Sequence, residues 1–290
     1  MKSRTLIAAA ICFIGFSCVF FFSGQASIYF NATAMLVVVF GTLGSVVLGS
    51  GPEGVRQAWR SAGAAYSEKN ISEQILVKEL LRTAHVYKRT GRINLSEETP
   101  HYPPLIHGVE MIEDGYTEME IREIFQAEAK AFVQHREEME RIFRNMATYA
   151  PSFGVAGSVI GLVGMLVGLG DTSLILRSIP VTLVSTLYGI VLANFLFLPL
   201  AEKIRESTRG ELALRRLVLG GMVGMIRSTD FLKLQTMLNA ITTKREAQVD
   251  GLQILREIKA GLPHKRSKAN SAATHLDLAN AIKRTCRVER

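Results

Sequence analysis

Charged residues are absent from three stretches of the chain, and each stretch is long enough to hold at least one membrane span. The stretches lie between Arg4 and Glu53, between Arg144 and Asp171, and between Arg177 and Glu202. A helix needs about 20 mostly apolar residues to cross roughly 30 Å of hydrocarbon, and the first stretch has room for two such helices. The pattern predicts an all-α integral membrane protein with four transmembrane helices, at about 6–23, 33–50, 151–170 and 178–201.

Amphipathic segments flank these spans. Between Thr117 and Tyr149 apolar residues recur at helical spacing, namely Ile121, Phe125, Phe132, Met139, Ile142 and Met146. No helix breaker precedes Pro151, so the third span is predicted to continue as a helix into the cytoplasm. A second helix is expected to extend the fourth span to about residue 225, and residues 71–90 are predicted to form a further amphipathic helix.

These elements divide the chain into five parts. They are the first two spans (1–50), a cytoplasmic helical domain (51–148), the third and fourth spans (149–202), a cytoplasmic helical tail (203–260) and a basic extension (261–290). For the extension two readings are open, a solvated or partly disordered tail and adsorption to anionic lipid.

The charge distribution sets the orientation. The chain has 34 Lys and Arg against 26 Asp and Glu, a net charge of +8, and only Arg177 among the basic residues lies in an expected outer loop. Basic residues favour the cytoplasmic side, so both termini are predicted to be cytoplasmic, and this bias explains the net charge without nucleic acid. Lys2 and Arg4 before an apolar run also resemble a signal peptide, and cleavage there is the alternative. The three cysteines have no metal-ligand spacing.

The third span carries a stripe of glycines. Gly154, Gly157, Gly161, Gly164 and Gly168 alternate at spacings of three and four residues, which places them on one helix face. Each costs roughly 1 kcal/mol relative to alanine in a helix interior, so something must approach this face closely. Two partners are open, another helix or permeating ions.

Polar side chains are the other feature of the last two spans, and most of them are hydroxyl groups. They are Ser152, Ser158, Thr182, Ser185, Thr186, Tyr188 and Asn194. Hydroxyls can coordinate a cation or order water, but they do not carry a proton at neutral pH as a carboxylate does. They can equally well hydrogen-bond to the backbone or to a neighbouring helix. If an ion crosses here, the titratable group must come from another chain.

The segments "YAPSFGVAGSVIGLVGML" and "PVTLVSTLYGIVLANFLFLPLAEKI" resemble the third and fourth transmembrane helices of the MotA/PomA family, the ion-conducting stator subunits of the bacterial flagellar motor. The resemblance extends from about residue 28 to 240 and is closest to the sodium-driven PomA branch. It implies a homo-oligomeric ring, reported as five copies, around a dimeric B subunit (MotB/PomB-like) whose aspartate carries the ion. It also implies a multi-pass protein of the bacterial inner membrane that acts in motility and chemotaxis.

The resemblance assigns roles to individual residues. Pro151, Gly154, Ser158, Ser185 and Thr186 fall on the ion path, with transient sodium near Ser158 and Thr186. Ring or partner packing is implied for Gly157, Gly161, Gly164, Gly168, Tyr188 and Asn194. Asn31 replaces an aspartate of the sodium branch, so no role is taken over from that aspartate.

The family's torque-generating charges are basic and then acidic residues about eight apart, which contact the rotor. Lys88 matches the principal basic residue, but the acidic partner position is Ser96; Arg89 and Glu97 restore the spacing one residue later, beside Glu98. We expect these four charged residues to face a FliG-like rotor switch protein. Exposed charges at a helix tip are otherwise only a solvated surface, and that reading stays open.

The resulting hypothesis is a stator A subunit, not an enzyme, that has no cofactor and transports a cation, with sodium favoured over the proton. Its partners are the B subunit, the rotor, further copies of itself and membrane lipid. One rival is an ExbB/TolQ-type energiser of envelope processes, although such proteins typically have three spans. The other is a non-conducting membrane scaffold in which the glycine stripe only packs helices.

Overall fold

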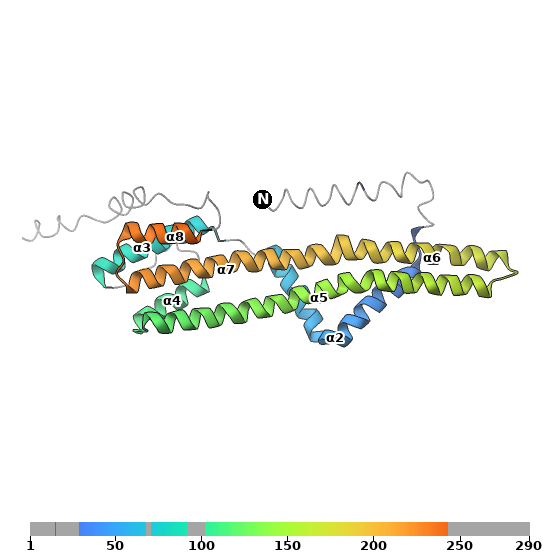
Figure 1. Ribbon diagram of the computed structural model, residues 1–290, viewed down its shortest axis with the longest axis horizontal. Coiled ribbons are helices and arrows are strands. Elements are labelled where there is room, and N and C mark those ends of the chain that lie inside the picture. The colour runs from blue at the N-terminus through green and yellow to red at the C-terminus, as the bar shows by residue number, and fades with distance from the viewer. Residues whose placement is uncertain (1–14, 16–28, 68–70, 92–101, 243–290) are drawn as a thin grey trace, which may run out of the picture. The chain divides into compact units, whose positions relative to one another are not determined.

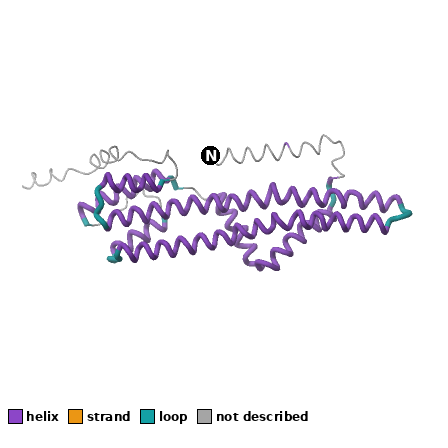
Figure 2. The backbone as a smooth tube through the Cα atoms, viewed as in Figure 1, coloured by secondary structure: helices purple, strands orange, loops and turns teal. Residues whose placement is uncertain are grey.

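The computed structural model describes residues 15, 29–67, 71–91 and 102–242, and its regular elements in this part of the chain are all helical (Figures 1 and 2). The elements are α2 (Ala32–Ser67), α3 (Glu73–Thr90), α4 (Pro103–Glu113), α5 (Glu118–Val167), α6 (Thr172–Val191), the π-helical η2 (Leu192–Phe197), α7 (Leu198–Ile226) and α8 (Phe231–Ile241). The chain separates into two compact units. Unit 1 contains residues 1–70 and 122–215, and unit 2 contains residues 71–121 and 216–290.

Three helical runs among the described residues are long and apolar enough to cross a membrane. They are α2, α5 and the run Thr172–Ile226, which joins α6, η2 and α7. The helices expected at 33–50 and 178–201 lie within these runs, whereas the helix expected at 151–170 ends earlier, at Val167. The helix α5 is continuous from Glu118 through Pro151 as predicted. The expected span at 6–23 and the chain beyond residue 242 lie outside the described residues.

The helix α2 is sharply bent at Gly51, which adopts φ 71° and ψ 158°. Only glycine adopts such a conformation without steric cost, and Pro52 follows it as the first residue of the next helical segment. The apolar span therefore ends where the sequence predicts. The segment 52–67 then runs as a separate helix that buries Ala58, Ala62 and Ala65.

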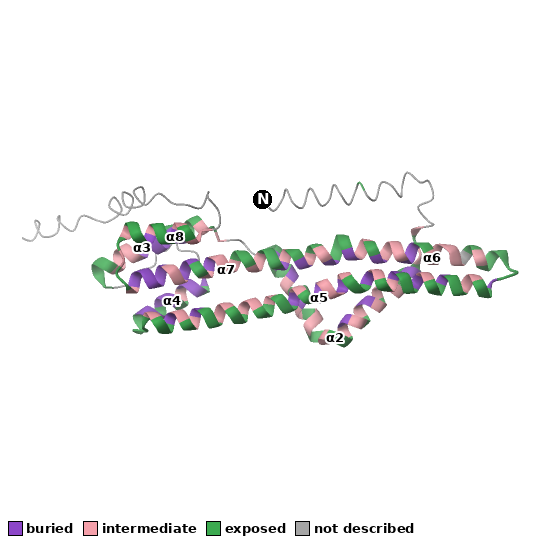
Figure 3. Cartoon of the chain, in the orientation of Figure 1, coloured by how far each residue is buried: buried purple, intermediate pink, exposed green. Residues whose placement is uncertain are grey.

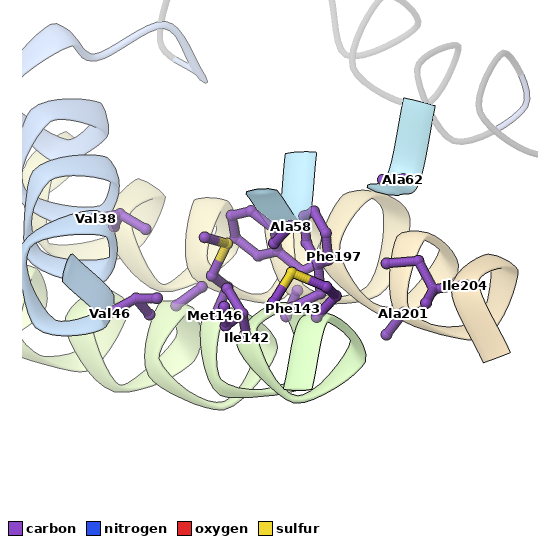
Figure 4. Close-up of a cluster of buried hydrophobic side chains, with 13 residues drawn as sticks. Val38, Val46, Ala58, Ala62, Ile142, Phe143, Met146, Phe197, Ala201 and Ile204 are labelled. Carbon is purple, nitrogen blue, oxygen red and sulfur yellow. The ribbon is translucent and has the colours of Figure 1, made fainter. Parts of the chain in front are cut away.

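The core of unit 1 is formed by α2, α5 and the α6–α7 run. Its centre contains Phe143 and Met146 of α5, both fully buried, packed against Ala58 and Phe197 (Figure 4). Trp59 contacts the Phe143 ring edge-on, with 5.3 Å between the ring centroids. The small alanines of residues 52–67 let this segment approach α5 and α7 closely, which explains why the segment carries so many of them.

Arg144 of α5 makes two ionic contacts near this core, one of which links α5 to α7. The Arg144 guanidinium contacts Glu140 on its own helix at 2.7 Å and Glu202 of α7 at 2.8 Å. Arg144 and Glu202 stand where the charge-free stretches begin and end, so the pair fixes the relative register of the two helices at that level.

The buried face of the α6–α7 run follows a four-residue spacing. Ser185, Gly189, Ala193, Phe197 and Ala201 are all buried. In a regular α-helix each step of four residues overshoots one turn by about 40°, so this series would rotate away from the core. The π-helical η2 winds by less per residue, which keeps Phe197 and Ala201 on the inner face.

Unit 2 is a small helical bundle of α3, α4, α8 and the adjoining ends of α5 and α7. The inner face of α3 buries Leu76, Leu80 and Leu81, and an alternating pattern of buried and exposed residues is visible along α3 and α8 (Figure 3). A Cβ added at Gly221 would lie 2.6 Å from Leu80, and one added at Gly224 would lie 2.3 Å from Leu234. These two glycines therefore let the leucines of α3 and α8 pack directly against the α7 backbone.

Candidate functional site

The hydroxyl groups that the sequence singles out meet between α5 and α6. Ser158 Oγ lies 2.6 Å from Thr186 Oγ1 and 3.4 Å from Ser185 Oγ. Ser158 also donates a short hydrogen bond to the Thr182 carbonyl. Ser158 of α5 thus contacts three polar groups on neighbouring turns of α6, and we call Ser158, Ser185 and Thr186 the hydroxyl cluster.

The members of the hydroxyl cluster differ in exposure. Ser185 is fully buried and donates to the Val181 carbonyl of its own helix at 2.7 Å. Ser158 and Thr186 are partly exposed at the edge of the α5–α6 contact. A cation or a carboxylate approaching this edge would therefore meet Ser158 and Thr186 first, while Ser185 supports Ser158 from behind.

The glycine stripe faces α6 of the same chain along its whole length. A Cβ at Gly157 would lie 2.7 Å from Ser185 Cβ, and one at Gly161 would lie 2.2 Å from Thr182 Oγ1. The corresponding contacts of Gly164 and Gly168 are with Ser178 and Leu174. The stripe is therefore packed against α6 of the same chain, and the ring or partner packing that the resemblance implies for these glycines stays a prediction.

Gly154 and Pro151 mark the end of the same contact that lies farthest from the loop between α5 and α6. A Cβ at Gly154 would lie 2.9 Å from the Ser185 carbonyl oxygen, and Thr186 Oγ1 lies 3.4 Å from the Gly154 carbonyl oxygen. From the opposite side, a Cβ at Gly189 would lie 2.5 Å from the Ala150 carbonyl oxygen and 2.9 Å from Pro151 Cα. Backbone therefore meets backbone here, which brings the hydroxyl groups of the two helices within hydrogen-bond distance.

Tyr188 and Asn194, expected to pack against other chains, are bonded within the chain. The Tyr188 hydroxyl donates to the Tyr29 carbonyl and accepts from the backbone N–H of Asn31 at 3.1 Å. Asn194 donates to the Ile190 carbonyl at 2.9 Å, and its side chain is exposed. Tyr188 thus tethers the start of α2, whereas Asn194 remains on an open face where another chain has access to it.

The predicted rotor-facing charges lie in unit 2. Lys88 and Arg89 occupy the exposed last turn of α3, and Gly91 ends this helix with φ 67°. The Lys88 ammonium contacts Asp230, the residue before α8, at 2.9 Å. Glu97 and Glu98 lie outside the described residues.

Two features of these sites are missing from the sequence prediction. The first is the Thr182 carbonyl, which accepts from Ser158; the signal was Ser158 itself, since a serine in an apolar helix commonly bonds to a neighbouring helix. The second is Asp230, which is far from Lys88 in the sequence, so that no local pattern pairs the two.

The sequence of this chain is similar to those of known motility proteins. Residues 96–216, which include α5, α6 and η2, match the model of the MotA/TolQ/ExbB proton channel family. Motility protein A of Bacillus subtilis (strain 168) is 27% identical over 230 residues, which are 78% of this chain and 85% of that protein. The chemotaxis protein PomA of Vibrio alginolyticus is 25% identical over 202 residues, covering 70% of this chain and 80% of that protein.

A solved structure shares the arrangement of helices. The flagellar MotAB stator complex from Bacillus subtilis matches with a TM-score of 0.72 and 26% sequence identity, over 80% of this chain and 92% of the matched chain. The structural similarity therefore extends over a larger share of the chain than the segment matched by the family model. Residues 96–216 are thus similar to the MotA/TolQ/ExbB proton channel family, and the fold of the chain is similar to that of a chain of the MotAB stator complex.

Proposed function

We propose that the chain is the ion-conducting A subunit of a bacterial flagellar-motor stator, located in the inner membrane with both termini cytoplasmic. With a dimeric B-type (MotB/PomB-like) partner it conducts a cation and converts the flow into torque on a FliG-like rotor protein. The observation that carries the proposal is the hydroxyl cluster, because Ser158 and Thr186 bring two hydroxyl groups together at 2.6 Å inside an otherwise apolar helix pair.

The chemistry of the cluster defines what the partner must supply. Within the described part of the three apolar runs, residues 33–50, 152–170 and 178–201 contain no charged side chain. Hydroxyl and carbonyl oxygens stabilise a cation or hydrogen-bond to a carboxylate, but they do not relay protons by titrating. The partner's aspartate therefore carries the ion, and Ser158 and Thr186 hold its loaded and empty forms with different affinity. A ligand drives a conformational change only through such a difference.

The exposed apolar surface supports assembly with other chains and with lipid. Along α5 and α6 the side chains of Val159, Leu162, Leu166, Leu176 and Leu183 are at least half exposed. A single chain in water would not expose so much apolar surface, whereas lipid or neighbouring subunits would cover it. We propose a homopentameric ring on the basis of the family resemblance; the glycine stripe gives no support to it, since α6 occupies that face.

Sodium is the favoured cation. Ser158, Ser185 and Thr186 together with the Thr182 carbonyl offer several neutral oxygen ligands, which suit a hard cation. The similarity to PomA agrees with this choice but does not distinguish it, because proteins named motility protein A match at comparable identity.

Two rivals differ in a measurable way. An ExbB/TolQ-type energiser belongs to the same family model, but several relatives with long matches are named motility protein A or PomA. A non-conducting scaffold would explain the glycine stripe alone. Expressing the chain with its B partner in a stator-deficient motile bacterium tests the proposal. Restored swimming supports it, and an assembled complex that restores neither swimming nor cation flux into vesicles refutes it.

A further inference from the structure

The ion pair between Lys88 and Asp230 stands in the rotor-contact site that the family resemblance implies. The two side chains are 2.9 Å apart, and both are substantially exposed. The pair joins the last turn of α3 to the residue before α8. His85, about one turn earlier in α3, packs edge-on against Phe231 of α8. A basic residue expected to contact another protein thus already holds a carboxylate of its own chain.

The position of Asp230 at the start of α8 offers its carboxylate a second set of hydrogen-bond donors. Asp230 is the N-cap residue of α8 with an extended backbone, yet its carboxylate makes no capping hydrogen bond. An N-cap aspartate ordinarily accepts from the free N–H groups of the first helical turn. Lys233, in that first turn, also attracts the Asp230 carboxylate. The carboxylate can therefore leave Lys88 and still be stabilised at the start of its own helix.

Like charges exclude one another at this site. A second carboxylate that approaches the Lys88 ammonium would come close to Asp230, and the repulsion between the two carboxylates opposes simultaneous contact. From this geometry we propose that Asp230 competes with an acidic partner surface for Lys88, so that Asp230 sets the affinity of the rotor-contact site. The inference rests on the proposed function only for the identity of that partner.

The expected size of the effect follows from the exposure of the pair. Exposed ion pairs are weak, which makes the exchange easy and reversible. Removing Asp230 should therefore tighten the binding of an acidic ligand at Lys88 by between about 1.4-fold and five-fold. Salt should reduce the difference, because exposed charges are screened.

The test uses the full-length chain in inverted membrane vesicles at low ionic strength, with a hexaglutamate peptide as the acidic probe. Mass spectrometry follows the labelling of the Lys88 amine by an acylating reagent, and the measured quantity is the peptide concentration that halves labelling. In Asp230→Asn, which keeps a good N-cap residue, this concentration should fall by the stated factor. Asp114→Asn, which removes the same charge at the end of α4 in the same unit, should leave it unchanged.

An unchanged or raised concentration in Asp230→Asn overturns the competition. Failure of the proposed function looks different. In one such outcome the chain restores no motility, but its Asp230→Asn variant still binds the peptide more tightly at Lys88. That outcome supports the competition by Asp230 and refutes the stator function.

Discussion

The hydroxyl oxygens of Ser158 on α5 and Thr186 on α6 lie 2.6 Å apart, within hydrogen-bond distance across the contact of two otherwise apolar helices. The approach depends on Gly154 and Gly157, since a Cβ at either position would collide with the backbone or side chain of Ser185. The glycines and the hydroxyls are therefore one structural feature. The face of α5 that consists of glycines allows α6 to bring its polar groups within hydrogen-bond distance of Ser158.

Thr186→Ala should abolish most cation flux while the complex still assembles. Hydrogen bonds between membrane helices average only about 0.6 kcal/mol, so the fold tolerates the loss of this hydroxyl. Flux into vesicles and co-purification of the B subunit measure the two effects separately. Thr208→Ala is the matched control, because the Thr208 hydroxyl bonds only to the Ile204 carbonyl of its own helix. Normal flux in an assembled Thr186→Ala complex would show that the hydroxyl is merely structural.

Gly189→Ala should destabilise the protein far more than Gly44→Ala. The new methyl group at residue 189 would lie 2.5 Å from the Ala150 carbonyl oxygen and 2.9 Å from Pro151 Cα, and neither backbone atom can move aside alone. Overpacking of this kind costs about 1–3 kcal/mol or more. At Gly44, in the span of α2, nothing lies within 4 Å of the added carbon. Thermal unfolding in mild detergent compares the two variants, and equal midpoints would contradict the close contact of α5 and α6.

Ser228→Gly should stabilise unit 2. Ser228 lies in the turn between α7 and α8 with φ 48°, and it is the only residue other than glycine with positive φ in the described chain. A side chain in this conformation costs of order 1 kcal/mol, which glycine relieves while losing part of the gain to chain entropy. A rise in the unfolding midpoint relative to Ser228→Ala is expected. A fall would mean that the serine side chain makes a contact worth more than the strain.

The stability that Asp230 contributes should depend on pH. The hydrogen bond from Lys88, and after it the charge of the same ammonium, holds the pKa of Asp230 below its ordinary value. The contribution is therefore complete above the unfolded-state pKa of about 3.9 and is lost as the pH falls through the lower folded-state pKa. The midpoint difference between the wild type and Asp230→Asn should be constant near neutrality and vanish in acid.

Lys88→Met provides the control for that titration. Without the ammonium, the pH-dependent difference that Asp230→Asn produces in the unfolding midpoint should shrink to the smaller part due to Lys233. If the difference is undiminished in the Lys88→Met background, the pairing with Lys88 does not lower the pKa of Asp230.

Native mass spectrometry from a gentle detergent should detect a homo-oligomer, with five copies expected from the resemblance. The exposed leucines and valines of α5 and α6 need neighbours or lipid, so dissociation should require harsher detergent. A monomer under gentle conditions would count strongly against a ring.

The sequence was sufficient to predict most of the helices. Charge-free stretches and helical periodicity predicted α3, the long α5 and the extension of the fourth span to Ile226. The resemblance assigned Ser158, Ser185 and Thr186 to the ion path, and the structure brings their hydroxyl groups together between α5 and α6. The expected first span and the charges Glu97 and Glu98 lie outside the described residues, so these expectations stay predictions.

What the sequence could not give was the identity of partners. A glycine stripe signals a close approach but not which helix approaches, and only the geometry shows that α6 does so. In the same way, Lys88 has an acidic neighbour 142 positions away. Tyr188 was expected to face another chain, yet it bonds to Tyr29 and Asn31, because a hydroxyl in an apolar helix takes the nearest backbone group.

The π-helical turn from Leu192 to Phe197 has a consequence for natural variation in length. Such a turn accommodates one residue more than a regular α-helix over the same rise. Removing Leu196, which is exposed, would let this segment close into a regular α-helix while Ser185 and Ala201 keep their places on the inner face. A single-residue deletion, which would rotate every later side chain in an ordinary helix, could thus be absorbed here, whereas a deletion at Gly210 in α7 could not.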